Sequence, residues 1–199
     1  MTEKKFVLVT GATGGLGEPV VRLLSASGRW TVFAAGTNRK RLERLGLLPH
    51  VHPLVLDVTL PDSIDHACSE VRAHAAGLDA IVHLAGTTAF APLIGADAVA
   101  RIDRFLAVNL LGMARVNQHF FPLLRVPGGR IVHCSSEAGR MTSQPFAGAY
   151  YLSKHAVEAY SDSLRRELMF RKISVVVLQP GHFQTQMTDD VRRGYEKSR

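Results

Sequence analysis

Residues 10–17 read TGATGGLG and lie between an apolar run, FVLVT at Phe6–Thr10, and a helical pattern that includes Val20 and Leu24. Glycine permits a sharp turn, a close approach of the backbone to a pyrophosphate, and close packing of a helix on a strand. The N–H groups that begin the helix also attract phosphates. A glycine-rich loop between a strand and a helix is therefore typical of a dinucleotide-binding site. The loop residues that we expect to contact a cofactor are Gly11, Thr13, Gly15, Leu16 and Gly17.

Five further apolar runs continue this pattern along the chain. They are TVFAA at Thr31–Ala35, PLVLD at Pro53–Asp57, AIVHL at Ala80–Leu84, RIVHC at Arg130–Cys134 and SVVVL at Ser174–Leu178. The spacing of apolar residues predicts helices over Leu16–Ser27, Lys40–Leu45, Asp62–Ala76, Ile102–Leu124 and Tyr150–Arg171. Apolar strands that alternate with helices predict an α/β protein: a doubly wound Rossmann fold, with a six-stranded parallel sheet and helices on both faces. We expect the 199 residues to form a single domain.

The composition argues against several classes of protein. No apolar run reaches the ~18 residues of a membrane helix, and the N-terminus lacks the features of a signal peptide, so we expect no membrane span and a cytoplasmic location. Cys68 and Cys134 lie far apart, which predicts neither a disulfide framework nor a metal site. The net charge of +7 is spread over small groups typical of solvated helix faces, so we predict no nucleic-acid binding.

The end of the second predicted strand bears on the choice of dinucleotide. An acid at this point would bind the ribose 2′-hydroxyl, whereas a basic residue would accept a 2′-phosphate. The sequence here is Gly36-Thr37-Asn38-Arg39-Lys40, with no acid. This favours NADP(H), with NAD(H) possible, and predicts cofactor contacts at Thr37 and Arg39. Arg39 and Lys40 could equally form the solvated first turn of a helix.

The residues with the most specific chemistry are Tyr150 and Lys154, which lie four apart and so on one face of a helix. A phenol has a pKa of about 10, and an adjacent ammonium would bring it toward the range of a general acid or base. Tyr151 lies three residues from Lys154 and is the weaker candidate. Such a pair alone is usually only a surface contact, but here it follows Ser135 and Ser136, whose hydroxyls could hold a substrate oxygen.

In its glycine-rich loop, its serine pair and its Tyr150/Lys154 pair, the sequence resembles the short-chain dehydrogenase/reductase family, and the resemblance extends over nearly its whole length. The matching pieces are TGATGGLG, LDVT with Asp57 and Val58, the turn Ala85-Gly86, VNLLG with Asn109, IVHCSSEAG, YYLSK, and PGHFQT with Thr185. The stretch Glu158–Leu168 resembles the branch that acts on retinols, hydroxysteroids and hydroxybutyrate.

The resemblance implies a role for each matching residue. Tyr150 would be the general acid/base, and Lys154 would tune its pKa and bind the nicotinamide ribose. Ser136 would orient the substrate oxygen, with Ser135 as an alternative. Asn109 would support a water that relays protons to Lys154, although it could instead bend or cap a helix. The remaining implied cofactor contacts are Asp57 with Val58 at the adenine, Ala85, Gly86, and Pro180, Gly181 and Thr185 at the carboxamide.

Three departures from the family pattern are visible. His83-Leu84 stands where the family usually has two asparagines, so a side chain that ties the central strands is expected to be missing. Ser136 and Tyr150 are fourteen positions apart rather than the usual thirteen, which puts an extra residue in the loop 140–144. The chain stops at Arg199, so we expect the region that would cover the substrate, after about residue 187, to be truncated, in a fragment or a form covered by a partner subunit.

Two functions are compatible with these residues. The first is an NAD(P)-dependent oxidoreductase acting on a hydrophobic alcohol or carbonyl substrate, and the second is a non-catalytic dinucleotide-sensing or protein-interaction module. The resemblance also implies a homodimer or homotetramer, formed through the helices predicted at Ile102–Leu124 and Tyr150–Arg171.

Overall fold

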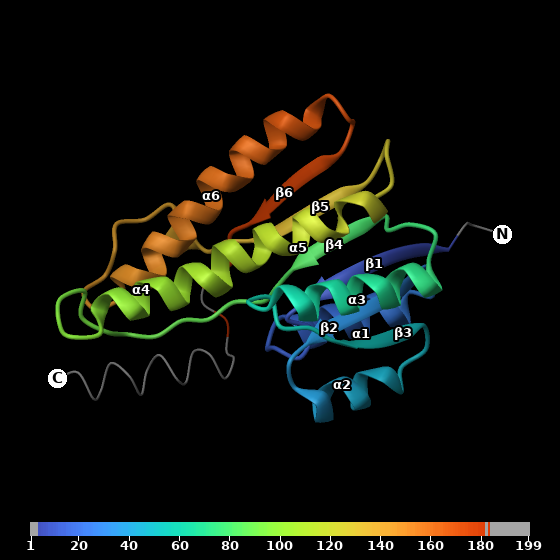
Figure 1. Cartoon of the computed structure of the whole chain (residues 1–199), viewed down its shortest axis with the longest axis horizontal. Coiled ribbons are helices and arrows are strands. Elements are labelled where there is room, and N and C mark those ends of the chain that lie inside the picture. Colours follow the sequence, from blue (N-terminus) through green and yellow to red (C-terminus); the bar gives the residue numbers. More distant parts are fainter. Residues whose placement is uncertain (1–3, 182, 184–199) are drawn as a thin grey trace.

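The computed structural model describes residues 4–181 and 183, and it confirms the predicted α/β fold (Figure 1). Six parallel strands form one sheet in the order β3-β2-β1-β4-β5-β6. Their bounds are β1 Lys5–Thr10, β2 Trp30–Gly36, β3 Val51–Val55, β4 Ala80–His83, β5 Arg130–Cys134 and β6 Ser174–Leu178. The strand order reverses between β1 and β4, which is where open α/β sheets bind ligands.

The helices divide between the two faces of the sheet. Their bounds are α1 Gly17–Ala26, α2 Arg39–Gly46, α3 Pro61–His74, α4 Ala98–Leu106, α5 Met113–Phe120 and α6 Gly148–Met169. One apolar core joins α3, α5 and α6 to the sheet, and its fully buried residues include Phe33, Ile81 and Phe120. A second core joins α1 and α2 to the other face around Val9 and Val21. Among the described residues, no helix has both the length and the hydropathy needed to cross a bilayer.

The long helix predicted at Ile102–Leu124 is interrupted in the structure. Between α4 and α5 lies a π-helical turn, η1 (Ala107–Gly112), and a 3-10 turn, η2 (Phe121–Leu123), follows α5. Gly112 faces the side chain of Val58 closely, since a Cβ at Gly112 would lie 2.6 Å from Val58 Cγ2. The wider π turn therefore brings the helix backbone close to the loop that follows β3.

The third strand also differs from its predicted bounds, because it ends at Val55 rather than Asp57. The carboxylate of Asp57 accepts hydrogen bonds from the backbone N–H of Thr59, at 2.9 Å, and from the Thr59 hydroxyl, at 2.6 Å. Such an Asx turn replaces the extended backbone at that point.

The sequence suggested that a side-chain link between the central strands would be missing. In the structure, such a link joins β4 and β5, and it consists of His83 of β4, His133 of β5 and Asn117 of α5. The two histidines are directly paired in register, and their ring centroids are 5.2 Å apart. Asn117 Oδ1 accepts a hydrogen bond from His83 Nε2 at 2.8 Å, and Asn117 Nδ2 donates to His133 Nε2 at 3.1 Å. Because an amide oxygen only accepts and an amide nitrogen only donates, His83 carries its proton on Nε2 and His133 on Nδ1. The proton on His133 Nδ1 is then donated to Ser161 Oγ of α6, 2.8 Å away.

Candidate active site

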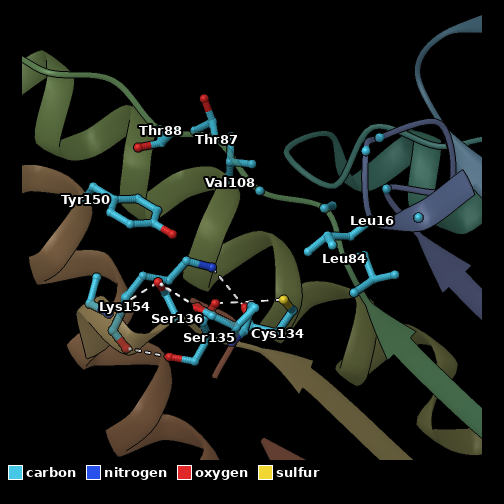
Figure 2. Close-up of a pocket in the computed structure, with 18 of the residues that line it drawn as sticks. Leu16, Leu84, Thr87, Thr88, Val108, Cys134, Ser135, Ser136, Tyr150 and Lys154 are labelled. Atoms are coloured by element: carbon cyan, nitrogen blue, oxygen red, sulfur yellow. Dashed lines mark hydrogen bonds between the residues drawn. The ribbon is translucent and has the colours of Figure 1, made fainter. Parts of the chain in front are cut away.

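A cavity of about 860 Å³ opens at the carboxyl ends of the strands, where the strand order reverses. It brings together most of the residues predicted from the sequence: Gly11, Thr13, Gly15, Leu16, Gly17, Thr37, Asp57, Val58, Ala85, Gly86, Ser136, Tyr150, Lys154, Pro180 and Gly181. Arg39 and Asn109 do not line it, and Thr185 lies outside the described residues. Figure 2 shows Tyr150 and Lys154 on one side of the cavity and Leu16 and Leu84 on the other.

The glycine loop packs against neighbouring backbone too closely for side chains at two of its positions. Gly11 has a φ of +66°, and a Cβ there would lie 2.4 Å from the backbone nitrogen of Ala85. A Cβ on Gly17 would lie 2.1 Å from the carbonyl oxygen of Gly11. This tight turn places the loop and the start of α1 along the cavity, in the arrangement typical of phosphate binding.

At the end of β2, the structure brings a different basic residue to the loop than the sequence suggested. Arg39 is exposed on the first turn of α2, which Asn38 caps by accepting a hydrogen bond from the backbone N–H of Arg41 at 3.1 Å. The Arg41 side chain reaches back and donates from Nη1 to the carbonyl oxygen of Thr13 at 2.9 Å. Arg41 belongs to the same charged run as Arg39, but only the direction of the helix reveals which of the two faces the loop.

Tyr150, Ser136 and Lys154 meet at the opposite end of the cavity. Tyr150 and Ser136 both line the cavity here, and the Ser136 hydroxyl is near enough to lower the pKa of the Tyr150 phenol. Lys154 Nζ lies 5.7 Å from the centroid of the Tyr150 ring and donates to the carbonyl oxygen of Cys134 at 2.9 Å. With the extra residue in the loop 140–144, Ser136 and Tyr150 still line the same cavity.

The pKa of Tyr150 differs from the sequence expectation, which had Lys154 lowering it. Burial raises the pKa of Tyr150 above its ordinary value, and the nearby Ser136 hydroxyl opposes that rise. Burial also lowers the pKa of Lys154. In this arrangement the phenol keeps its proton at neutral pH, which suits a group that donates a proton to a substrate oxygen.

The two neighbouring serines point to different partners. Ser136 Oγ accepts a hydrogen bond from the backbone N–H of Ala138 at 3.2 Å, at the start of the 3-10 turn η3 (Glu137–Gly139). The Ser135 hydroxyl is directed to the carbonyl oxygen of Lys154 on α6, 3.5 Å away. Both serines line the cavity, and Ser135 also connects the end of β5 to α6.

Asn109 lies buried in η1, behind the cavity wall. Its Oδ1 accepts from the backbone N–H of Thr87 at 2.8 Å, and its Nδ2 donates to the carbonyl oxygen of Thr87 and to Ser153 Oγ. A Cβ placed on Gly86 would lie 3.5 Å from Asn109 Oδ1 and 4.0 Å from Lys154 Nζ. Asn109 thus both sits in the irregular helical turn and fixes the loop after β4 beside Lys154.

The profile of a protein family described as short chain dehydrogenase matches residues 5–196. The chain belongs to the short-chain dehydrogenase family. Retinol dehydrogenase 16 of Mus musculus is 37% identical over 196 residues, and 17-beta-hydroxysteroid dehydrogenase type 6 of Homo sapiens is 36% identical over 193 residues. These matches cover 96% and 94% of this chain, and the chain spans about 60% of the length of Retinol dehydrogenase 16.

The fold of this chain is also similar to that of a solved short-chain dehydrogenase. A short-chain dehydrogenase from Streptomyces avermitilis superposes with a TM-score of 0.83 at 27% identity. The superposition covers 93% of this chain and 68% of the other. The Rossmann-like fold predicted from the sequence is therefore shared with a solved short-chain dehydrogenase.

Proposed function

We propose that this chain carries the active site of an NADP(H)-dependent oxidoreductase that interconverts a hydrophobic alcohol and its carbonyl compound. The observation that carries the proposal is that Tyr150, Ser136 and Lys154 line the same cavity as the glycine loop, with Lys154 Nζ 5.7 Å from the centroid of the Tyr150 ring. A nicotinamide cofactor, when bound, supplies or accepts the hydride in this class of chemistry.

The chain's own residues would handle the proton and the substrate oxygen. In the reducing direction, the Tyr150 hydroxyl donates its proton to the carbonyl oxygen as that oxygen gains negative charge, and Ser136 holds the same oxygen with a second hydrogen bond. Lys154 places a positive charge beside the phenolate that remains. Asn109 would hold the loop around Gly86 and Thr87 so that a water can pass a proton to Lys154.

The walls near Tyr150 support a hydrophobic substrate. Phe90 and Ala147 pack in one apolar cluster with Tyr150, and both line the cavity, as does Phe183. The relatives named as retinol and hydroxysteroid dehydrogenases support the same class of substrate, because their names refer to large apolar alcohols. Assembly as a homodimer or homotetramer and a cytoplasmic location stay predictions from the sequence.

The experiment that tests this function follows NADPH absorbance at 340 nm with a panel of apolar aldehydes and ketones. We expect Tyr150→Phe to lower kcat by about 10²- to 10⁴-fold, the usual contribution of a general acid, while the dissociation constant of NADPH stays unchanged. Tyr151→Phe tests the alternative tyrosine, and we expect turnover to persist in it. Turnover by Tyr150→Phe at the wild-type rate would exclude the assignment. Cofactor binding without turnover of any carbonyl would favour the non-catalytic dinucleotide-sensing module instead.

The preference for NADP(H) has its own test at the end of β2. The region Gly36–Asn38 offers no acid to a 2′-hydroxyl, and the guanidinium of Arg41 lies beside Thr13, where a 2′-phosphate could meet it. We expect Arg41→Met to raise the dissociation constant of NADPH about tenfold, as the loss of one charge-assisted contact would, and to leave that of NADH unchanged. Arg39→Met is the matched control, since it removes an exposed charge from the same helix. An equal loss for both cofactors, or a larger loss in Arg39→Met, would contradict the role given to Arg41.

A further inference from the structure

A buried carboxylate lies one helical turn beyond Lys154 on α6. Glu158 follows Lys154 by four residues, so the two share a face of the helix. The Glu158 side chain is only 7% exposed, although it does not line the cavity. A charge removed from water in this way is costly unless other groups compensate it.

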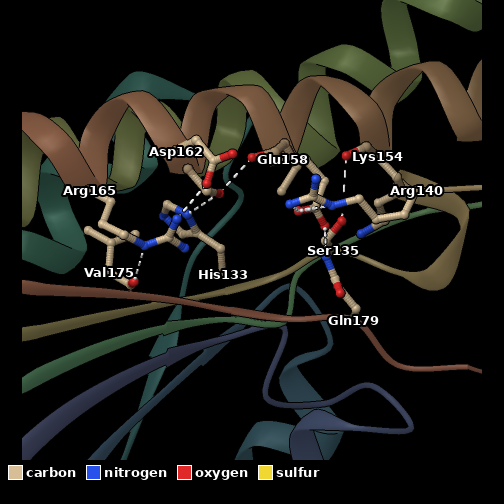
Figure 3. Close-up of polar contacts among 11 residues, drawn as sticks. His133, Ser135, Arg140, Lys154, Glu158, Asp162, Arg165, Val175 and Gln179 are labelled. Carbon is tan, nitrogen blue, oxygen red and sulfur yellow. Dashed lines mark hydrogen bonds and ion pairs between the residues drawn. The ribbon is translucent and has the colours of Figure 1, made fainter.

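The partners of Glu158 come from two separate segments of the chain, as Figure 3 shows. Arg140, which follows η3, donates from Nε and Nη2 to Glu158 Oε2, both at 3.1 Å. Gln179, which follows β6, donates from Nε2 to Glu158 Oε1 at 2.9 Å. Each carboxylate oxygen thus holds a different segment against α6.

Both segments continue directly into the wall of the cavity. The carbonyl oxygen of Pro180, the residue after Gln179, accepts from the backbone N–H of Glu137 at 3.1 Å and from Ser136 Oγ at 3.5 Å. The segment that carries Ser136 and the segment that carries Pro180 and Gly181 are therefore joined to each other as well as to Glu158.

The η3 turn approaches α6 at the same place. A Cβ on Gly139 would lie 2.6 Å from Ser135 Oγ, 2.9 Å from Glu158 Cγ and 3.0 Å from the carbonyl oxygen of Lys154. Such close packing leaves little room for the turn to move while Glu158 keeps its partners. The position of the Ser136 hydroxyl relative to Tyr150 and Lys154 thus depends on contacts made at Glu158.

Glu158 also acts on the charge of Lys154. Burial lowers the pKa of Lys154, whereas the interaction with Cys134 and, after it, the negative charge of Glu158 raise it. The carboxylate therefore helps Lys154 to remain protonated inside the protein.

We propose that Glu158 is a positioning residue of this active site, which aligns Ser136 and the Pro180-Gly181 backbone with Lys154 by binding Arg140 and Gln179 at once. The inference rests on the proposed function, because it concerns the groups that would hold the substrate and the nicotinamide. It predicts that changes at Glu158 alter cofactor binding and catalysis although Glu158 touches neither ligand.

The test compares Glu158→Gln and Arg140→Met with Asp162→Asn in the full chain. Asp162 is a suitable control because it lies one turn further along α6 and pairs there with Arg165 on the protein surface. We measure the dissociation constant of NADPH from its fluorescence, and kcat/KM for a carbonyl substrate across the pH range. We expect Glu158→Gln and Arg140→Met each to weaken NADPH binding and to lower kcat by about fivefold or more, and Asp162→Asn to change neither.

Two further readouts separate positioning from a merely structural role. Without the carboxylate, Lys154 loses its proton at a lower pH, so the alkaline decline of kcat/KM should begin at lower pH in Glu158→Gln, but not in Asp162→Asn. Both substitutions break the same contact, the one between Arg140 and Glu158. The double variant Glu158→Gln/Arg140→Met should therefore lose no more NADPH affinity than the more impaired single variant.

The opposite results would overturn the inference. It fails if Glu158→Gln lowers only the melting temperature and keeps the wild-type affinity, kcat and pH profile, or if the losses of the two single variants add. An inactive wild type that still binds NADPH would overturn the proposed catalysis alone, and the affinities of the variants would then decide the role of Glu158. A wild type that does not bind NADPH would overturn both.

Discussion

His83 and His133 are buried residues that ordinarily titrate near neutral pH but are held neutral here. Burial lowers the pKa of His83 from 6.5 to about 4, against the opposing hydrogen bond with Asn117. Burial, together with the charges of His83 and Arg165, lowers the pKa of His133 to about 2. In the unfolded chain both rings would titrate near their ordinary value, so below pH 6.5 the unfolded state binds protons that the folded state does not.

We therefore expect these two histidines to destabilise the fold as the pH falls from 6.5 toward 4. Each should lower the free energy of unfolding by about 1.4 kcal/mol per pH unit in that window. This loss is absent above pH 6.5, where both rings are neutral in the folded and the unfolded chain. Urea denaturation between pH 7 and 4.5 measures this slope. His83→Asn should make it shallower, whereas His66→Asn, which changes a histidine with a 73% exposed side chain, should leave it as in the wild type. An identical slope in His83→Asn and the wild type would show that the histidine network does not control acid stability.

At the scale of elements, the π turn η1 connects α4 to α5 and places Asn109 where it can bind two other parts of the chain. Its amide holds both backbone groups of Thr87, after β4, and the hydroxyl of Ser153, on α6. A regular helix over the same residues would turn Asn109 by a different angle and break this bridge. The irregular turn is thus the local structure that lets one side chain join three elements.

Asn109→Ala tests this bridge through stability. The change leaves buried groups of the loop and of α6 without their partners, so we expect the free energy of unfolding to fall by about 1–3 kcal/mol. Gln118→Ala is the matched control, because it removes an exposed amide from α5 and should cost about 0.5 kcal/mol or less. Urea denaturation at pH 7 gives both values. Equal losses in the two variants would mean that the Asn109 amide contributes no more than a surface side chain.

For the whole molecule, local sequence patterns predicted the architecture better than the contacts within it. The runs RIVHC and SVVVL coincide with β5 and β6, and the loop TGATGGLG lies at the predicted strand-to-helix turn. These features depend on residues that are neighbours in the chain, so periodicity and glycine placement reveal them.

The contacts that sequence reasoning missed join residues far apart in the chain. Asn117 binds His83 and His133, which lie 34 and 16 residues away from it in the sequence. Glu158 binds Arg140 and Gln179, which lie 18 and 21 residues away from it. Their partners follow from side-chain directions and from the crossing of helices over the sheet, which a periodic pattern does not specify. For the same reason, the sequence could suggest a basic residue near the second strand but could not choose Arg41 over Arg39.

The close contact between Gly11 and Ala85 joins an early segment of the chain to a later one, so the binding site cannot form until both have been synthesised. The glycine loop leaves the ribosome early, but the backbone that it packs against directly follows β4, and the Pro180 carbonyl that binds Glu137 follows β6. Because domains are made from the N-terminus onward, the complete cleft can exist only after almost all the described residues have emerged. A cofactor can thus stabilise the finished protein, but it cannot guide the first stages of its folding.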